Sequence, residues 1–103
     1  MARLHDLGVR LIGGTDAIRR FGDYHLTFET FRECGLPVAE ALAAMTSVAA
    51  ESMGVADDTG RLATGLLADV LIANADPASD DRALRQVRQV YRRGEAVLAQ
   101  NGA

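Results

Sequence analysis

The chain has 103 residues with a formal net charge of −3, and 49% of them are hydrophobic but only 5% aromatic. This length allows one domain at most, with a core of Ala, Leu and Val, and the acidic balance argues against a nucleic-acid partner. The single cysteine excludes an internal disulfide, no apolar run reaches the roughly 18 residues of a membrane span, and no signal peptide precedes "MARLHDLG", so we expect a cytoplasmic protein without a membrane partner.

The first segments have the pattern of an α/β unit. Residues 2–7 look like the end of a helix that stops at Gly8. "VRLI" at 9–12 is short and β-rich, which predicts a buried strand that turns at the glycine pair Gly13-Gly14.

Three helices are predicted next. The first carries Leu26, Phe28 and Phe31 at helical spacing, which places these side chains in the core. The predicted helices and their starting signals are 24–33 after Asp23, 38–45 after Pro37, and 48–53 after Ser47.

Strand and turn signals dominate the rest of the chain. "LLADVLIA" at 66–73 is apolar apart from Asp69, which predicts a mostly buried strand. A lone strand or hairpin is not stable without neighbours, so we expect something else to cover the strand edges. After the polar loop "NADPASDD", the predicted elements are a short helix near 82–86 and strands at 87–92 and 96–99, joined by a turn at Arg93-Gly94.

Asp16 is the first candidate for chemistry. A carboxylate at the carboxyl end of a core strand can bind a metal and accept a proton from a metal-bound water. Capping of the turn or of the next helix is the alternative. His25 follows nine residues later and could overhang the same strand end, in contact with substrate rather than with a metal. These two residues are too few for a metal site, which takes three or four ligands.

Other reactive side chains favour structural roles. Cys34, beside Gly35, has no paired cysteine or obvious base, which predicts a buried structural thiol. Thr46 and Ser47 are better explained by helix capping than by catalysis. The arginines favour a solvated face over a phosphate site, and no nucleotide-binding glycine motif is present. The arginines in question are Arg82, Arg85, Arg88, Arg92 and Arg93.

The order of the segments resembles the C-terminal part of the metal-dependent amidohydrolase superfamily, in its imidazolonepropionase- and prolidase-like branch. The likeness covers about residues 2–99. The segments that carry it are "GVRLIGGTDA", "ETFRECGLPVAEALAAMTSVAAESMGV", "TGRLATGLLADVLIANADP" and "VRQVYRRGEAV".

The resemblance implies an α/β fold class: a C-terminal fragment of a (β/α)₈ barrel followed by strands of a small β-sandwich. Residues 1–54 would be the last barrel strand with its helices, and residues 55–103 the strands of the composite sandwich. Folded alone, such a segment would be α+β.

The resemblance also implies an activity: hydrolysis of a C–N bond in a small-molecule amide by water activated on Zn²⁺ or a similar divalent metal. Asp16 matches the family's metal ligand and catalytic base, His25 matches a substrate contact more loosely, and Asp69 matches a structural position. The family's His-x-His pair and its other ligands have no counterpart here. We therefore expect this segment to be inactive alone and to need a second copy or a missing N-terminal part. The alternative is a small non-catalytic α+β module for self-association or protein interaction.

Overall fold

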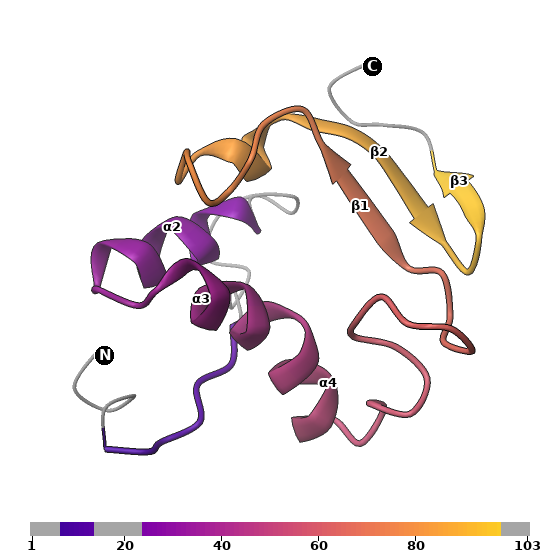
Figure 1. Cartoon of the computed structure of the whole chain (residues 1–103), viewed down its shortest axis with the longest axis horizontal. Helices are drawn as coiled ribbons and strands as arrows, with labels where there is room; N and C mark the ends of the chain where they lie inside the picture. Colours follow the sequence, from indigo (N-terminus) through magenta and orange to yellow (C-terminus); the bar gives the residue numbers. More distant parts are fainter. Residues whose placement is uncertain (1–6, 14–23, 98–103) are drawn as a thin grey trace.

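The computed structural model describes residues 7–13 and 24–97, and it combines a helical unit with a small sheet (Figure 1). Within these ranges the architecture is α+β, as expected for this segment folded alone. The helices are α2 His25–Glu33, α3 Val38–Met45, α4 Ser47–Ser52 and the 3-10 helix η1 Ala83–Arg85, and the strands are β1 Val70–Ala73, β2 Val87–Arg92 and β3 Glu95–Val97.

The core lies between α2 and α3. Phe28 and Phe31 lie three residues apart on α2 and are both buried, which confirms their predicted place in the core. Leu26, predicted to lie there too, is only half-buried. Alanines on α3 let the two helices approach closely around the two rings. The buried cluster consists of Phe28, Phe31, Leu36, Ala41 and Ala44.

The helix starts differ from the sequence prediction. Tyr24 occupies the N-cap position of α2 without a side-chain hydrogen bond, and the predicted cap, Asp23, lies outside the described residues. Pro37 stands at the N-cap position of α3, one residue before the first helical turn. Ser47 is the first residue of α4 rather than its cap.

Thr46 separates α3 from α4. Its backbone angles, φ −129° and ψ −92°, interrupt the helix there. Its hydroxyl donates to the carbonyl oxygen of Leu42 at 2.7 Å, so it bonds back to the end of α3 instead of capping α4. Thr46 thus occupies the cap position between the two helices, whereas the predicted cap role of Ser47 is wrong, because Ser47 is the first residue of α4.

The three strands form an antiparallel sheet in the order β1-β2-β3. Val70 pairs with Tyr91, and Val90 pairs with Val97. The turn predicted at Arg93-Gly94 is confirmed: both residues have positive φ, 52° and 83°, the geometry of a two-residue type I′ hairpin.

Two of the predicted strands differ from the structure. Residues 9–12 form no strand in the described structure, because no described strand pairs with them. The strand predicted at 66–73 is reduced to β1, since Leu66 lies in a bend after the turn at 64–65 and residues 67–69 have no regular structure. Its predicted burial is also wrong, because Leu71 and Ile72 are 49% and 38% exposed.

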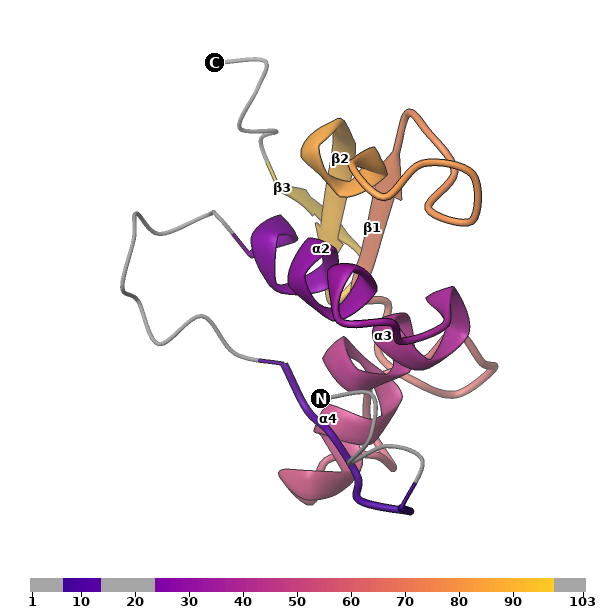
Figure 2. The ribbon, with the colours of Figure 1, turned by 90° about the vertical axis from the view of Figure 1, so that its left-hand side faces the viewer.

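The sheet meets the helical unit through η1. This short helix lies over α2 in both views of the ribbon (Figure 1 and Figure 2). Ala83 is fully buried there, and Leu84 packs against the helical core. The boundary predicted after residue 54 falls between α4 and the loop that leads to β1; as a division of domains it stays a prediction.

Candidate functional site

The structure describes one of the two predicted site residues. Asp16 lies outside the described residues, so its role as catalytic carboxylate and metal ligand stays a prediction. His25 is the first residue of α2 and is half-buried. Its predicted contact with substrate also stays a prediction.

The described residues that flank the Asp16 segment lie side by side. The hydroxyl of Tyr24 donates to the carbonyl oxygen of Gly13 at 3.4 Å, which is a weak hydrogen bond. The backbone N–H of Gly13 donates to the carbonyl oxygen of Ala44 at 2.9 Å. Gly13 and Tyr24 therefore lie close together at the N-terminal end of α2.

Close packing explains the glycine at position 13. A Cβ atom there would lie 2.9 Å from Cγ of Met45 and 3.0 Å from Cγ2 of Thr27. No positive φ is involved, so Gly13 is needed for close approach and not for a tight turn. Residues 7–13 can thus approach the helices closely because Gly13 has no side chain.

Glu29 and Arg85 form a two-pronged ion pair between α2 and η1. Arg85 donates from Nε to Oε2 at 2.8 Å and from Nη2 to Oε1 at 2.7 Å. The hydrogen bond from Arg85 is the main cause that lowers the pKa of Glu29 below 4.5; burial opposes it, and the charges of Arg85, His25 and Arg82 add smaller contributions. Both oxygens of Glu29 are occupied, so this carboxylate is a structural acceptor.

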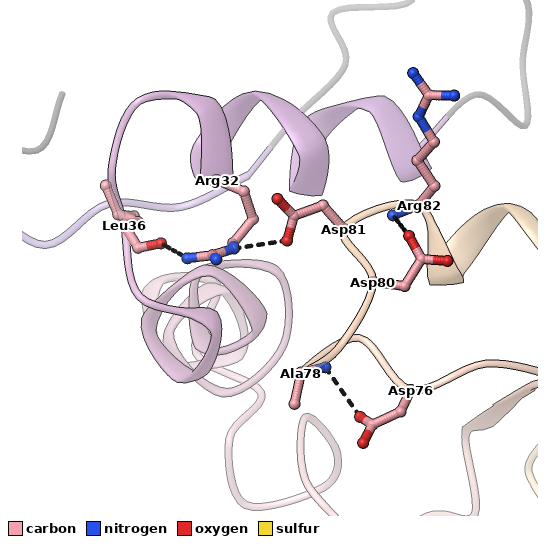
Figure 3. Close-up of polar contacts among 7 residues, drawn as sticks. All are labelled: Arg32, Leu36, Asp76, Ala78, Asp80, Asp81 and Arg82. Atoms are coloured by element: carbon pink, nitrogen blue, oxygen red, sulfur yellow. Dashed lines mark hydrogen bonds and ion pairs between the residues drawn. The ribbon is translucent and has the colours of Figure 1, made fainter.

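Arg32 makes a second link between α2 and the same segment (Figure 3). Its Nε donates to Oδ1 of Asp81 at 2.9 Å, and its Nη1 donates to the carbonyl oxygen of Leu36 at 2.6 Å. The carbonyl of Leu36 thereby holds the guanidinium in place for Asp81. The sequence patterns did not indicate either ion pair. Arg85 is exposed, as expected of a solvated face, and it binds Glu29 there.

The other aspartates of this acidic loop bond to the backbone (Figure 3). Asp76 accepts the N–H of Ala78, and Asp80 accepts the N–H of Arg82, each at 2.9 Å. Each closes a turn two residues on, as aspartate commonly does. The carboxylates therefore do not converge on a common point.

A metal centre is not complete within the described residues. In 7–13 and 24–97, no group of three or more His, Cys, Asp and Glu side chains could hold a metal ion. Catalytic zinc takes three protein ligands. These residues alone do not fit the metal that the resemblance implies.

Asp69 has the structural role expected of it. Its Oδ1 accepts the N–H of Arg93 and its Oδ2 accepts the hydroxyl of Thr59, both at 2.9 Å. These two bonds, the first being the larger, lower the pKa of Asp69. The carbonyl of Ala68 accepts the N–H of Gly94 beside them at 3.0 Å. The "AD" dipeptide thus fastens the tip of the β2–β3 hairpin.

Cys34 is exposed, so the prediction of a buried thiol is wrong. Phe31 and Leu36 fill the core on either side of it, which turns position 34 toward solvent.

A hollow of about 260 Å³ lies between the segment that begins at Gly8 and the helices α3 and α4. Its lining combines apolar side chains with Arg10 and Glu40. The sequence did not reveal it, because residues 9–12 were expected to be a buried strand. The lining residues are Gly8, Val9, Arg10, Leu11, Leu36, Glu40, Ala44 and Val48.

No helix in the described part of the chain combines the length and the apolar character that crossing a membrane requires.

Comparison with known proteins identifies the ancestry. A model of the amidohydrolase family matches residues 1–97. No curated protein matches the chain.

Several solved structures are similar to this chain. A candidate prolidase from Bifidobacterium longum has 35% identity and a TM-score of 0.86, over 94% of this chain and 25% of that one. An Xaa-Pro dipeptidase with methionine in its active site has 26% identity and a TM-score of 0.88, over 94% and 24%. Phenylurea hydrolase B has 36% identity and a TM-score of 0.69, over 73% and 16%.

The chain therefore spans about a quarter of the length of the prolidase-type structures that it matches. The family match extends over nearly all of its residues, and similar solved structures carry prolidase and amidohydrolase names. The chain belongs to the amidohydrolase family, on its prolidase-like branch.

Proposed function

We propose that the chain is one part of a metal-dependent amidohydrolase that hydrolyses a C–N bond in a small amide-type substrate. The observation that carries this proposal is the family match over residues 1–97. Xaa-Pro dipeptidase and phenylurea hydrolase are, by their names, hydrolases of a dipeptide and of a phenylurea. Both kinds of substrate contain a C–N bond to a carbonyl carbon.

Asp16 and His25 would act in one region of the enzyme. Asp16 follows Gly13 by three residues, so chain length keeps their Cα atoms within about 11 Å of each other. Gly13 is bonded to Tyr24, next to His25 at the start of α2. This supports a site in which Asp16 supplies a carboxylate and His25 contacts the substrate.

The remaining metal ligands would come from outside residues 7–13 and 24–97, because those residues hold no such group. A bound Zn²⁺ or similar ion would supply an activated water at neutral pH. The part left to Asp16 is to bind as one ligand and to hold a proton, and this chain alone would be inactive. We place the enzyme in the cytoplasm.

Exposed apolar side chains support the need for a partner. Leu7 and Ile12 are 70% and 50% exposed beside the hollow, and Leu71 is exposed on the sheet. Apolar surface and open strand edges of this kind are usually covered. We propose that the cover is a second copy of the chain or the N-terminal part of the enzyme.

Metal content tests the role of Asp16. The protein would be purified as its source cell makes it, with Asp16→Asn compared with Asp57→Asn, a change at an exposed acid. Loss of bound zinc and of dipeptide hydrolysis in Asp16→Asn alone supports the proposal. Equal zinc content in the two variants and the parent contradicts it.

The exposed apolar residues also favour a second candidate, a non-catalytic association module. Mass separates the two, since the chain alone weighs 11.0 kDa. An oligomer of 11.0 kDa chains without zinc supports the module. A native protein near 44 kDa (about four times larger, from the quarter coverage of the relatives) supports the enzyme.

A further inference from the structure

Two ion pairs join α2 to residues 81–85, and α2 supplies the acid in one pair and the base in the other. Glu29 on α2 binds Arg85, and Arg32 on α2 binds Asp81. We call these four residues the charge clasp. It joins α2 to η1 and to the residues just before η1.

The signs of the charges alternate on both partners. Glu29 and Arg32 lie three residues apart on one face of α2, and they meet Arg85 and Asp81 in reverse chain order. If the segment slid by one helical turn in one direction, Arg32 would face Arg85. If it slid in the other direction, Glu29 would face Asp81. Either slide brings like charges together.

The apolar contact at this joint has little power to select a position. Ala83 is fully buried but small, and Leu84 is only half-buried against the core. The methyl group of an alanine can pack at many positions along a helix. A guanidinium that donates two hydrogen bonds to one carboxylate has the right geometry at only one position. Position must therefore come from the polar contacts.

We propose that the charge clasp is a register lock, which fixes where residues 81–85 dock on α2 and so couples the sheet to the helix that begins at His25. The lock does not depend on Asp16, on a metal or on the proposed activity. Opposite charges attract each other in the observed register, and like charges would repel each other in a shifted one.

Charge reversal tests the lock in the purified protein, in whatever assembly it is isolated. Arg85→Glu should speed amide exchange about tenfold at the hydrogen bonds of this joint, because it sets two acids against each other. The reporting amides are Asn74, bonded to Gln86, and Gln86, bonded to Ala83. The amide of Ala41, bonded to Pro37 in α3, should not change.

Arg61→Glu is the matched control. It changes the net charge by the same amount at an exposed arginine that has no ion pair among the described residues. Equal effects of Arg61→Glu and Arg85→Glu would overturn the proposal. If Arg85→Glu fails to fold, Arg85→Gln is used with Arg61→Gln, and the same comparison decides.

The double variant Glu29→Arg/Arg85→Glu separates a lock from simple attraction. It restores opposite charges across the joint, but it leaves two positive charges on α2 and two negative charges on the segment. The slid positions are then no longer repelled. We expect docking to return with a second set of amide signals at Ala83 and Leu84. A single set with full protection, or no return of protection, would overturn the lock.

Discussion

The carboxylate of Asp69 accepts a hydrogen bond of 2.9 Å from the backbone N–H of Arg93, which lies 24 residues later in the sequence. It thereby joins the entrance of β1 to the turn between β2 and β3. Arg93 has φ of 52°, a conformation that non-glycine residues rarely adopt, so this bond supports the strained position of the turn.

Asp69→Ala should loosen this turn. The N–H of Arg93 and the hydroxyl of Thr59 would both lose their acceptor, and amide exchange at Arg93 and Gly94 should become faster. The pKa of Asp69 lies below its ordinary 3.8 in the folded chain. The contribution of the Asp69 carboxylate to the stability of the fold is therefore complete above pH 3.8. It is lost as the pH falls through the lower pKa that Asp69 has in the folded chain. Unchanged exchange at Arg93 in Asp69→Ala would contradict this role.

Stability should also depend on pH through Glu29. Its pKa is lowered from 4.5, chiefly by the hydrogen bond from Arg85, with smaller effects from the charges of His25 and Arg82. The stabilisation is present above pH 4.5 and disappears as the pH falls through the folded pKa. Glu29→Gln should cost about 1 kcal/mol at pH 7, since Arg85 is partly exposed, and should flatten this part of the pH profile. Urea unfolding from pH 3 to pH 7 measures both effects; parallel profiles for parent and variant would exclude them.

Gly13→Ala should destabilise the packing of residues 7–13 on the helices. The new Cβ would lie 2.9 Å from Cγ of Met45, and the cost of such crowding is about 1–3 kcal/mol. Because the Met45 side chain is the nearest neighbour, Met45→Ala combined with Gly13→Ala should lose less stability than the two single changes add up to. Simple additivity in thermal unfolding would show that the two residues do not crowd each other.

Cys34 should react with a thiol reagent in the native protein. The side chain is exposed at the C-terminal end of α2, so labelling needs no unfolding. Cys34→Ser should change the free energy of unfolding by less than about 0.5 kcal/mol. Labelling that required denaturant would show that the thiol is covered in the native assembly.

Local signals predicted local structure. β2 has the bounds expected from its apolar and turn residues, and the hairpin turn lies at Arg93-Gly94 as expected. Phe28 and Phe31 are buried as the helical period indicated. Each of these features is decided by residues within a few positions of one another.

Features that depend on distant residues were predicted poorly. Residues 9–12 have the composition of a strand, but a strand also needs a paired neighbour, and none is present in the described part of the chain. The pairing of Glu29 with Arg85 joins residues 56 positions apart, and no local pattern indicates it. Resemblance identified the family where spacing alone could not, and the site residue Asp16 stays a prediction.

The anchoring of the hairpin tip has a consequence for the order of folding. A two-residue hairpin closes within microseconds, because its contacts are local. The hydrogen bonds that Ala68 and Asp69 accept from the turn must instead close a longer loop. We therefore expect β2 and β3 to associate first and β1 to join them from the turn end, where Val70 meets Tyr91. Unfolding should begin at the opposite end of β1, near Ala73, where the register shift already interrupts the ladder.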